Sequence, residues 1–148
     1  MFVRHERAIL NYKRFKAAKR DFQPLIIVFY GPTGTGKSRT AMTLARMIGS
    51  VYVVPRPKNS GLYYDLYDGE DVLVYQEMYG STMPFATLLE LTDRYPFVLP
   101  DHGSGGLQCC SRVMIFCSNK HPRDWYKGEY ILLYNDASTF YGLFILLF

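Results

Sequence analysis

The sequence has few cysteines and no long apolar run, and each shortage excludes a class of protein. Its 148 residues include only three cysteines, Cys109, Cys110 and Cys117. The adjacent pair makes no disulfide framework and no Cys/His spacing resembles a zinc site, so reduced thiols in an intracellular protein are expected. The apolar tail, Phe140–Phe148, is too short to span a bilayer. With no signal-peptide pattern at the polar, basic N-terminus, no membrane partner is expected.

The composition is that of one folded domain with a mild excess of positive charge. Hydrophobic residues make up 49% and charged residues 20%, which is typical of a globular chain. The net charge of +4 permits a nucleic-acid partner without demonstrating one. Without a repeat or linker, we expect one core at residues 25–126. A basic N-terminal helix would precede it at 1–24, and an atypical apolar tail would follow at 127–148.

The stretch around which the chain is organised is Tyr30–Ser38, YGPTGTGKS, whose glycines, lysine and serine fit the phosphate-binding pattern G-x-x-x-x-G-K-[ST]. The apolar run Leu25–Tyr30 enters it and a helical pattern, Arg39–Met47, leaves it. Glycine lets the backbone turn its N–H groups toward a polyphosphate, and the helix N-terminus adds positive potential. We expect Lys37 to reach the β- and γ-phosphates of ATP and Ser38 to hold Mg²⁺. The whole predicted nucleotide site is Gly31, Pro32, Thr33, Gly34, Thr35, Gly36, Lys37, Ser38 and Arg39.

Two further apolar stretches end in polar residues. Val72–Tyr75 leads to Gln76 and Glu77. An acid in that place can bind Mg²⁺ and orient or deprotonate the attacking water, whereas Gln76 contributes no charge to the metal. Val113–Cys117 ends ahead of Asn119, which is either a sensor of the γ-phosphate or a turn residue. The candidate catalytic residues are therefore Lys37, Glu77 and Asn119, and the candidate metal ligands are Ser38 and Glu77.

These elements predict a three-layer α/β sandwich of the P-loop NTPase class, with a mostly parallel sheet and helices on both faces. Strands are expected at Leu25–Tyr30, Val51–Val54, Val72–Tyr75 and Val113–Cys117. One helix is expected at Ser38–Ile48, with Ile48 facing inward and Gly49 as its stop. A second is expected over Pro84–Tyr95, capped by Ser81 or Thr82.

Four stretches, in order, resemble a known family: GPTGTGKS, DVLVYQEMYGS, LLELTDRYPF and RVMIFCSNKHPRDWY. They look like the superfamily 3 helicase domain and, more narrowly, the replication-associated protein (Rep) of circovirus-like, circular single-stranded-DNA viruses. The resemblance covers roughly Phe2–Tyr126. The Tyr79-Gly80 pair and Ser118-Asn119 ahead of Trp125-Tyr126 are more specific than the phosphate loop. Related domains occur in RNA viruses, so an RNA helicase stays open.

The resemblance implies an AAA+-like ATPase that forms a ring, hexameric in that family, and translocates on single-stranded DNA or RNA. The resemblance also implies an intracellular location, which for a viral protein would be the host nucleus. By position, Glu77 is the second Walker B acid and Asn119 the motif C residue. Asp101–Gly106 falls where the family has a DNA-tracking hairpin, and His102 stands near its DNA-contacting lysine.

The sequence also departs from that family. Gln76 replaces the first Walker B acid, which should weaken Mg²⁺ binding. No arginine follows Arg123, so the arginine finger cannot be placed. The nickase domain that normally precedes this region is absent and the tail differs, which suggests a fragment or a decayed copy.

Three functions stay open at this stage. The first is an ATP-dependent replication helicase. The second is a module that binds nucleotide and nucleic acid without hydrolysis, with Lys58, Tyr63 and Tyr64 as strand contacts. Ordinary packing over the sheet is the favoured alternative for Tyr63, Tyr64 and Tyr67. The third is a small P-loop kinase, which lacks an arginine-rich lid.

Overall fold

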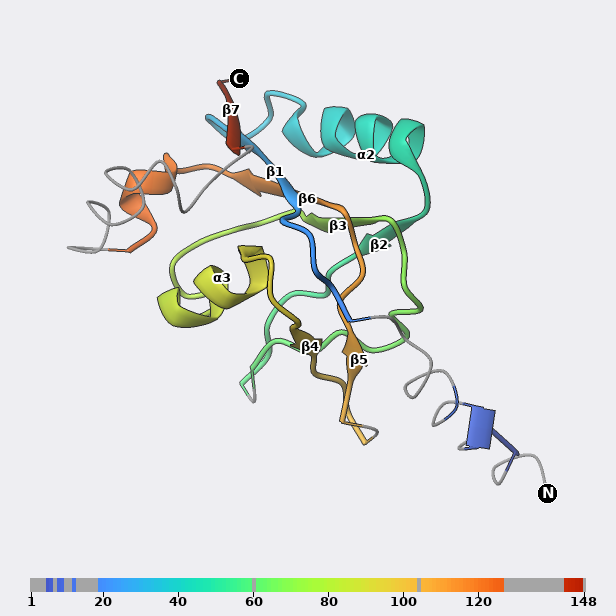
Figure 1. Ribbon diagram of the computed structural model, residues 1–148. Coiled ribbons are helices and arrows are strands. Elements are labelled where there is room, and N and C mark those ends of the chain that lie inside the picture. The colour runs from blue at the N-terminus through green and yellow to red at the C-terminus, as the bar shows by residue number, and fades with distance from the viewer. Residues whose placement is uncertain are drawn as a thin grey trace.

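The computed structural model describes residues 19–59, 61–103, 105–126 and 143–147, with His5, Glu6, Ala8, Ile9 and Tyr12 ahead of them. Its centre is a five-stranded parallel sheet in the order β2-β3-β6-β1-β7 (Figure 1). In chain order the elements are β1 (Leu25–Tyr30), α2 (Lys37–Ile48), β2 (Val51–Val53), β3 (Val72–Tyr75), α3 (Phe85–Thr92), β4 (Val98–Leu99), β5 (Leu107–Gln108), β6 (Val113–Ser118), the 3-10 turn η1 (Pro122–Asp124) and β7 (Leu143–Leu147).

The central strands are apolar throughout because both faces of the sheet are covered. All four residues of β3 and all six of β6 are buried. Pairing is in continuous register, with Ile27 of β1 opposite Ile115 of β6 and Val74 of β3 opposite the same Ile115. A parallel sheet between two layers buries successive side chains on alternate faces, so its strands show no polar alternation.

Helices lie on both faces of the sheet, as the sequence predicted (Figure 1). On one face, the small residues Ala41 and Ala45 of α2 pack against Val74 and Ile115. On the other face, Leu88 and Leu91 of α3 belong to a larger hydrophobic cluster. This cluster also contains buried side chains from the segments that follow β2 and β3. The three-layer α/β prediction is therefore confirmed.

Several predicted bounds were wrong by a few residues. β2 ends at Val53, although Val54 N–H still donates to the Val74 carbonyl at 2.9 Å. α2 begins at Lys37, and Ile48 at its end is exposed rather than inward.

The second predicted helix, Pro84–Tyr95, is shorter than expected and begins differently. α3 spans Phe85–Thr92, with Pro84 at its start and no side-chain cap. The Thr82 hydroxyl instead accepts from the Tyr79 backbone N–H at 3.0 Å and closes the turn before the helix. The prediction of a Ser81 or Thr82 cap was wrong because that hydroxyl serves the preceding turn.

The basic N-terminal segment is attached to the core by one buried arginine. Arg20 was predicted to lie in a basic N-terminal helix, but Lys19 and Arg20 are not helical and the Arg20 side chain is buried. Its guanidinium donates to the carbonyls of Leu91 at 2.7 Å, Glu90 at 3.0 Å and Tyr95 at 2.7 Å. These carbonyls lie in and just after the last turn of α3, where a cation is favourable. Most of the predicted helix at 1–24 lies outside the described residues.

Replacing Arg20 with methionine should therefore destabilise the domain. Because burial lowers the pKa of Arg20 but leaves it charged, the change removes charge-assisted hydrogen bonds that are buried at Leu91 and partly buried at Glu90 and Tyr95. We expect the free energy of unfolding to fall by about 2–4 kcal/mol, measured by urea unfolding. Lys19→Met, at the exposed neighbouring position, is the control. Equal stability of the two variants would contradict the assignment.

The sheet also contains a strand that the sequence analysis did not include. Backbone pairing places β7 parallel to β1, with Ile26 opposite Leu143 and Tyr30 opposite Leu147. Part of the tail thus extends the sheet, although the remainder of 127–148 lies outside the described residues. In the portion of the chain that is described, none of the helices has the length and hydropathy needed to cross a membrane.

Candidate nucleotide-binding site

The three predicted functional segments lie at one edge of the sheet because they follow three neighbouring parallel strands. The phosphate loop follows β1, Glu77 follows β3 and Asn119 follows β6, which lies between them. Backbone hydrogen bonds join the segments: Gly31 N–H donates to the Ser118 carbonyl at 3.2 Å. Ligands of open α/β sheets bind at this carboxyl edge.

The phosphate loop takes a conformation that requires glycine at two positions. Gly34 has φ 82° and Gly36 has φ 85°, both in the left-handed region. A Cβ at either residue would meet nothing within 4 Å, so backbone geometry rather than space requires glycine. The exposed loop leads into α2 at Gly36, which has no side chain and so cannot cap the helix.

The start of α2 fits a polyphosphate. The first turn carries no acidic residue, and no side chain caps its backbone N–H groups. Uncapped N–H groups together with the helix dipole attract an anion. Ser38 and Arg39 are exposed in this first turn, beside the exposed loop residues Pro32, Thr33, Gly34, Thr35 and Gly36. The donor chemistry therefore suits the phosphates of ATP.

Lys37 is held beneath the loop. Its side chain is buried, and Nζ donates to the carbonyls of Gly31 at 2.8 Å and Pro32 at 2.6 Å, and to the Thr35 hydroxyl at 3.4 Å. The ammonium is thus placed inside the curve of the loop with its charge satisfied by main-chain oxygens. A phosphate entering the loop would compete with these carbonyls for the same protons.

Glu77 forms an ion pair that the sequence analysis did not foresee. Its Oε1 accepts from Arg56 at 2.8 Å, while about 44% of the glutamate side chain stays exposed. Arg56 follows β2 just as Glu77 follows β3, and these strands are neighbours. An arginine two residues beyond a predicted strand end was the only sequence signal for it. Gln76 beside it is exposed.

The Ser118-Asn119 pair divides into a structural and an exposed member. Ser118 is buried; its hydroxyl donates to the Met78 carbonyl at 2.7 Å and accepts from the Trp125 indole N–H at 2.9 Å. Asn119 is exposed at the carboxyl edge and donates from Nδ2 to the Tyr79 hydroxyl at 3.2 Å. Lys37, Glu77 and Asn119 thus share an edge, while each bonds to a different partner.

The family-specific pairs Tyr79-Gly80 and Trp125-Tyr126 are in contact with each other. A Cβ built at Gly80 would lie 1.7 Å from the Trp125 carbonyl oxygen, so only glycine fits there. The Tyr126 hydroxyl donates to the Met83 carbonyl at 2.7 Å. These contacts fix the turn after Glu77 against the segment after Asn119.

The predicted nucleic-acid residues lie on a different part of the molecule. β4 and β5 form an antiparallel hairpin around Asp101–Gly106, at the bottom of Figure 1. His102 in its tip donates from its backbone N–H to Asp65 at 2.8 Å, and its Nδ1 lies 2.7 Å from Asp65 Oδ2. Both hydrogen bonds lower the pKa of the Asp65 carboxyl, and the bond from the His102 backbone N–H has the larger effect. The ring centroids of Tyr63 and His102 are 3.8 Å apart.

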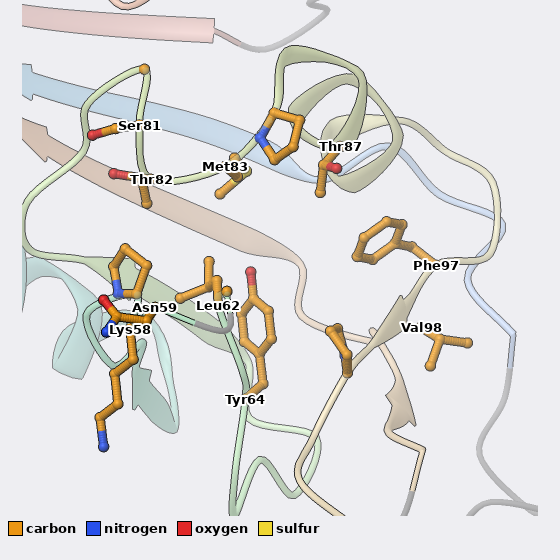
Figure 2. Close-up of a pocket in the computed structure, with 15 residues that line it drawn as sticks. Lys58, Asn59, Leu62, Tyr64, Ser81, Thr82, Met83, Thr87, Phe97 and Val98 are labelled. Carbon is orange, nitrogen blue, oxygen red and sulfur yellow. The ribbon is translucent and has the colours of Figure 1, made fainter.

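A hollow of about 830 Å³ separates the hairpin from α3 (Figure 2). Lys58 and Leu62 line one side, Thr82 and Met83 the opposite side, and Phe97 the end. The Lys58 ammonium points away from the hollow in Figure 2. The loop before β3 thus presents an exposed cation beside a largely apolar depression.

Two of the three candidate tyrosines in that loop serve the core. Tyr64 is buried and its hydroxyl lies 2.7 Å from that of Tyr75; Tyr67 is buried and its hydroxyl lies 2.8 Å from the Ser111 hydroxyl. Burial raises the pKa of both phenols. The packing interpretation is confirmed for these two residues, while Tyr63 is only half-buried against His102.

The parallel sheet, the glycine loop after β1 and the polar ends of β3 and β6 define an α/β P-loop NTPase fold. A family model described as RNA helicase matches residues 27–120, which span these elements. The chain belongs to this RNA helicase family.

The chain is also similar to replication-associated proteins of circoviruses. It is 39% identical over 130 residues to that of beak and feather disease virus, 35% over 127 residues to that of canary circovirus, and 35% over 129 residues to that of porcine circovirus 2. The matches cover 87%, 85% and 86% of this chain but 42%, 41% and 39% of the relatives. The chain thus spans about two fifths of their length, and the predicted resemblance to a circovirus-like Rep helicase region is confirmed.

Proposed function

We propose that the chain is the ATPase domain of a viral replication helicase, which hydrolyses Mg²⁺-ATP to move along single-stranded nucleic acid. The placement of the phosphate loop, Glu77 and Asn119 at one edge of the sheet, in a chain of the RNA helicase family, carries this proposal. It assigns nucleotide binding to Gly31–Arg39 and hydrolysis to the carboxyl ends of β3 and β6.

Each side chain then has a defined task, and Glu77 has two. The N–H groups at the start of α2 and the Lys37 ammonium bind the phosphates, and Ser38 and Glu77 hold Mg²⁺ with oxygen donors. Mg²⁺ neutralises charge on the phosphates when bound. Glu77 orients the attacking water and accepts its proton, while Asn119 donates toward the γ-phosphate. ATP and water thereby give ADP and phosphate.

The proposed nucleic-acid contacts are Lys58 and His102, on the exposed surface beside the hollow. The relatives named replication-associated protein come from circoviruses, and the matching family is named for RNA helicases, so single-stranded DNA and RNA are both proposed substrates. A homo-oligomeric ring, hexameric in the family it resembles, would bring a neighbour's arginine to each site. The host nucleus is the proposed location.

Unwinding tests the proposal directly. A fluorescent duplex with a single-stranded tail should separate when ATP and Mg²⁺ are added to the chain, and should stay paired with a non-hydrolysable ATP analogue. The assay needs both a DNA and an RNA duplex, because the proposal allows either nucleic acid as the substrate. Hydrolysis of ATP without strand separation on either duplex would reduce the function to that of an ATPase.

A binding module without hydrolysis is the second candidate, and Gln76 is the observation that favours it. Gln76 is exposed where the resemblance implies a metal-binding acid, and an amide adds no charge to a Mg²⁺ site. The match to a helicase model gives the small P-loop kinase no support.

Gln76→Glu should separate these two candidates. An added carboxylate beside Glu77 should lower the Mg²⁺ concentration for half-maximal hydrolysis roughly three- to ten-fold, because affinity rises with ligand charge. Phosphate release measured over a Mg²⁺ titration gives that concentration, with Gln76→Met as a control that lacks both oxygen and charge. If hydrolysis stays absent in Gln76→Glu, the binding module is the better description.

A further inference from the structure

The buried hydroxyl of Ser118 joins the two segments that follow β3 and β6. It donates its proton to the carbonyl of Met78, the residue after Glu77, at 2.7 Å. Its oxygen accepts from the Lys120 backbone N–H at 3.1 Å and from the Trp125 indole N–H at 2.9 Å. A hydroxyl offers one donor and two acceptor positions, so every one of them is used here. The two segments therefore share one saturated hydrogen-bonding group.

Trp125 holds this connection in place from the side of the core. Its indole N–H also donates to the Lys120 carbonyl at 3.3 Å, so this one donor reaches the residues on both sides of Asn119. The Trp125 side chain is buried, and its ring centroid lies 6.1 Å from that of Phe116 in β6. The Trp125 carbonyl leaves no room for a side chain at Gly80, in the turn after β3. One residue thus supports both segments.

The 3-10 turn η1 returns Trp125 to the end of β6. Pro122 lies at the start of the turn, where its fixed φ suits the helical conformation. The His121 side chain caps the turn by accepting from the Arg123 backbone N–H at 3.1 Å, and the Trp125 N–H donates to the Pro122 carbonyl at 3.1 Å. The indole is therefore placed by a short, ordered stretch of chain rather than by a flexible side chain.

Asn119 lies at the exposed end of this arrangement, with the backbone on both sides of it held. Its Nδ2 donates to the Tyr79 hydroxyl at 3.2 Å. An amide nitrogen carries two protons, so this bond leaves the second for an oxygen of a ligand. Because catalysis is sensitive to displacements of about 1 Å, a group that touches the γ-phosphate needs such a support.

We infer that Trp125 is a positioning residue for ATP hydrolysis. Its indole N–H holds the Ser118 hydroxyl, which in turn fixes the segment of Asn119 against the segment of Glu77. The effect on turnover rests on the proposed function. The physical connection between Asn119 and the indole does not, because it can be observed when a nucleotide binds and is not hydrolysed.

Turnover of Trp125→Phe is the first test, because phenylalanine keeps an apolar ring but has no N–H. We expect kcat for ATP to fall about ten-fold, less than the roughly 10²-fold cost of a 1 Å misplacement, while KM changes less than about two-fold. Tyr67→Phe is the matched control: it removes a buried hydroxyl that bonds to Ser111, just before the start of β6. Urea unfolding should show comparable losses of stability. Equal kcat in the two variants, or a change confined to KM, overturns the assignment.

Fluorescence is the second test, and it leaves Trp125 unchanged. Trp125 is the only tryptophan in the chain, so the emission reports this one position. A saturating non-hydrolysable ATP analogue with Mg²⁺ should shift the emission maximum, because the indole N–H is bonded to the segment that touches the γ-phosphate. ADP should bind without this shift, and Asn119→Ala, a change at an exposed position, should lose it. Calorimetry measures binding in each case.

The outcomes of the fluorescence experiment separate this inference from the proposed function. An equal shift with ADP or in Asn119→Ala overturns the connection, as does analogue binding to the wild-type chain without any shift. The expected pattern of shifts in a chain that does not hydrolyse ATP supports the connection and is a failure of the proposed function alone. Absence of nucleotide binding overturns both.

Discussion

Replacing Lys37 with methionine is expected to lower the rate of ATP hydrolysis by about 10²–10³-fold, the cost of losing one preorganised donor to the transferring phosphoryl group. The ammonium lies within the curve of the loop, 2.8 Å and 2.6 Å from the Gly31 and Pro32 carbonyls. Methionine keeps most of the buried stem but provides no proton and no charge. Phosphate release under saturating Mg²⁺-ATP measures the loss.

Lys120→Met is the matched control, because Lys120 is exposed and follows β6 at the same edge of the sheet. Removing Lys37 also leaves loop carbonyls without a donor, so thermal unfolding of both variants must accompany the rates. Wild-type turnover in a folded Lys37→Met protein would rule out this loop as the hydrolytic site.

Glu77→Gln should separate nucleotide binding from hydrolysis. The amide keeps the shape of the side chain but cannot accept the proton of the attacking water, so we expect turnover to fall about 10²–10⁴-fold. Binding of a fluorescent ATP analogue should change far less, because the loop and α2 supply most of the phosphate contacts. Single-turnover phosphate release and equilibrium binding together measure the split.

The exposed carboxylate of Glu90 on α3 gives the control Glu90→Gln, which should behave as the wild-type chain. Loss of nucleotide binding in Glu77→Gln that accounts for the whole loss of turnover would support only the Mg²⁺-binding role of Glu77 and leave the base unassigned.

The core of the fold could be predicted because local composition and sheet position agree. Apolar runs without alternation predicted β1, β3 and β6. The polar residues at the ends of these runs predicted the edge of the sheet at which the site lies. β7 was missed although LFILL is equally apolar. The sequence analysis only compared that run with the length of a membrane span. No local sequence pattern identifies an edge strand whose partner, β1, is more than 100 residues earlier.

Side-chain partners were less predictable than positions. Lys37, Glu77 and Asn119 could be placed from motif and strand end, since both are local signals. The partner of Glu77 could not, because Arg56 is 21 residues away and meets it only when β2 lies beside β3. Arg20 likewise binds carbonyls about 70 residues later, so the basic pattern around it could not show that this side chain is buried.

Turnover of Mg²⁺-ATP by the full chain, with and without a single-stranded oligonucleotide, tests the central claim most directly. Hydrolysis that depends on Mg²⁺, rises when the strand is added and disappears in Lys37→Met is the predicted result. ATP binding without turnover, with the strand present and Gln76→Glu unable to restore it, would contradict a motor and leave a nucleotide-binding module.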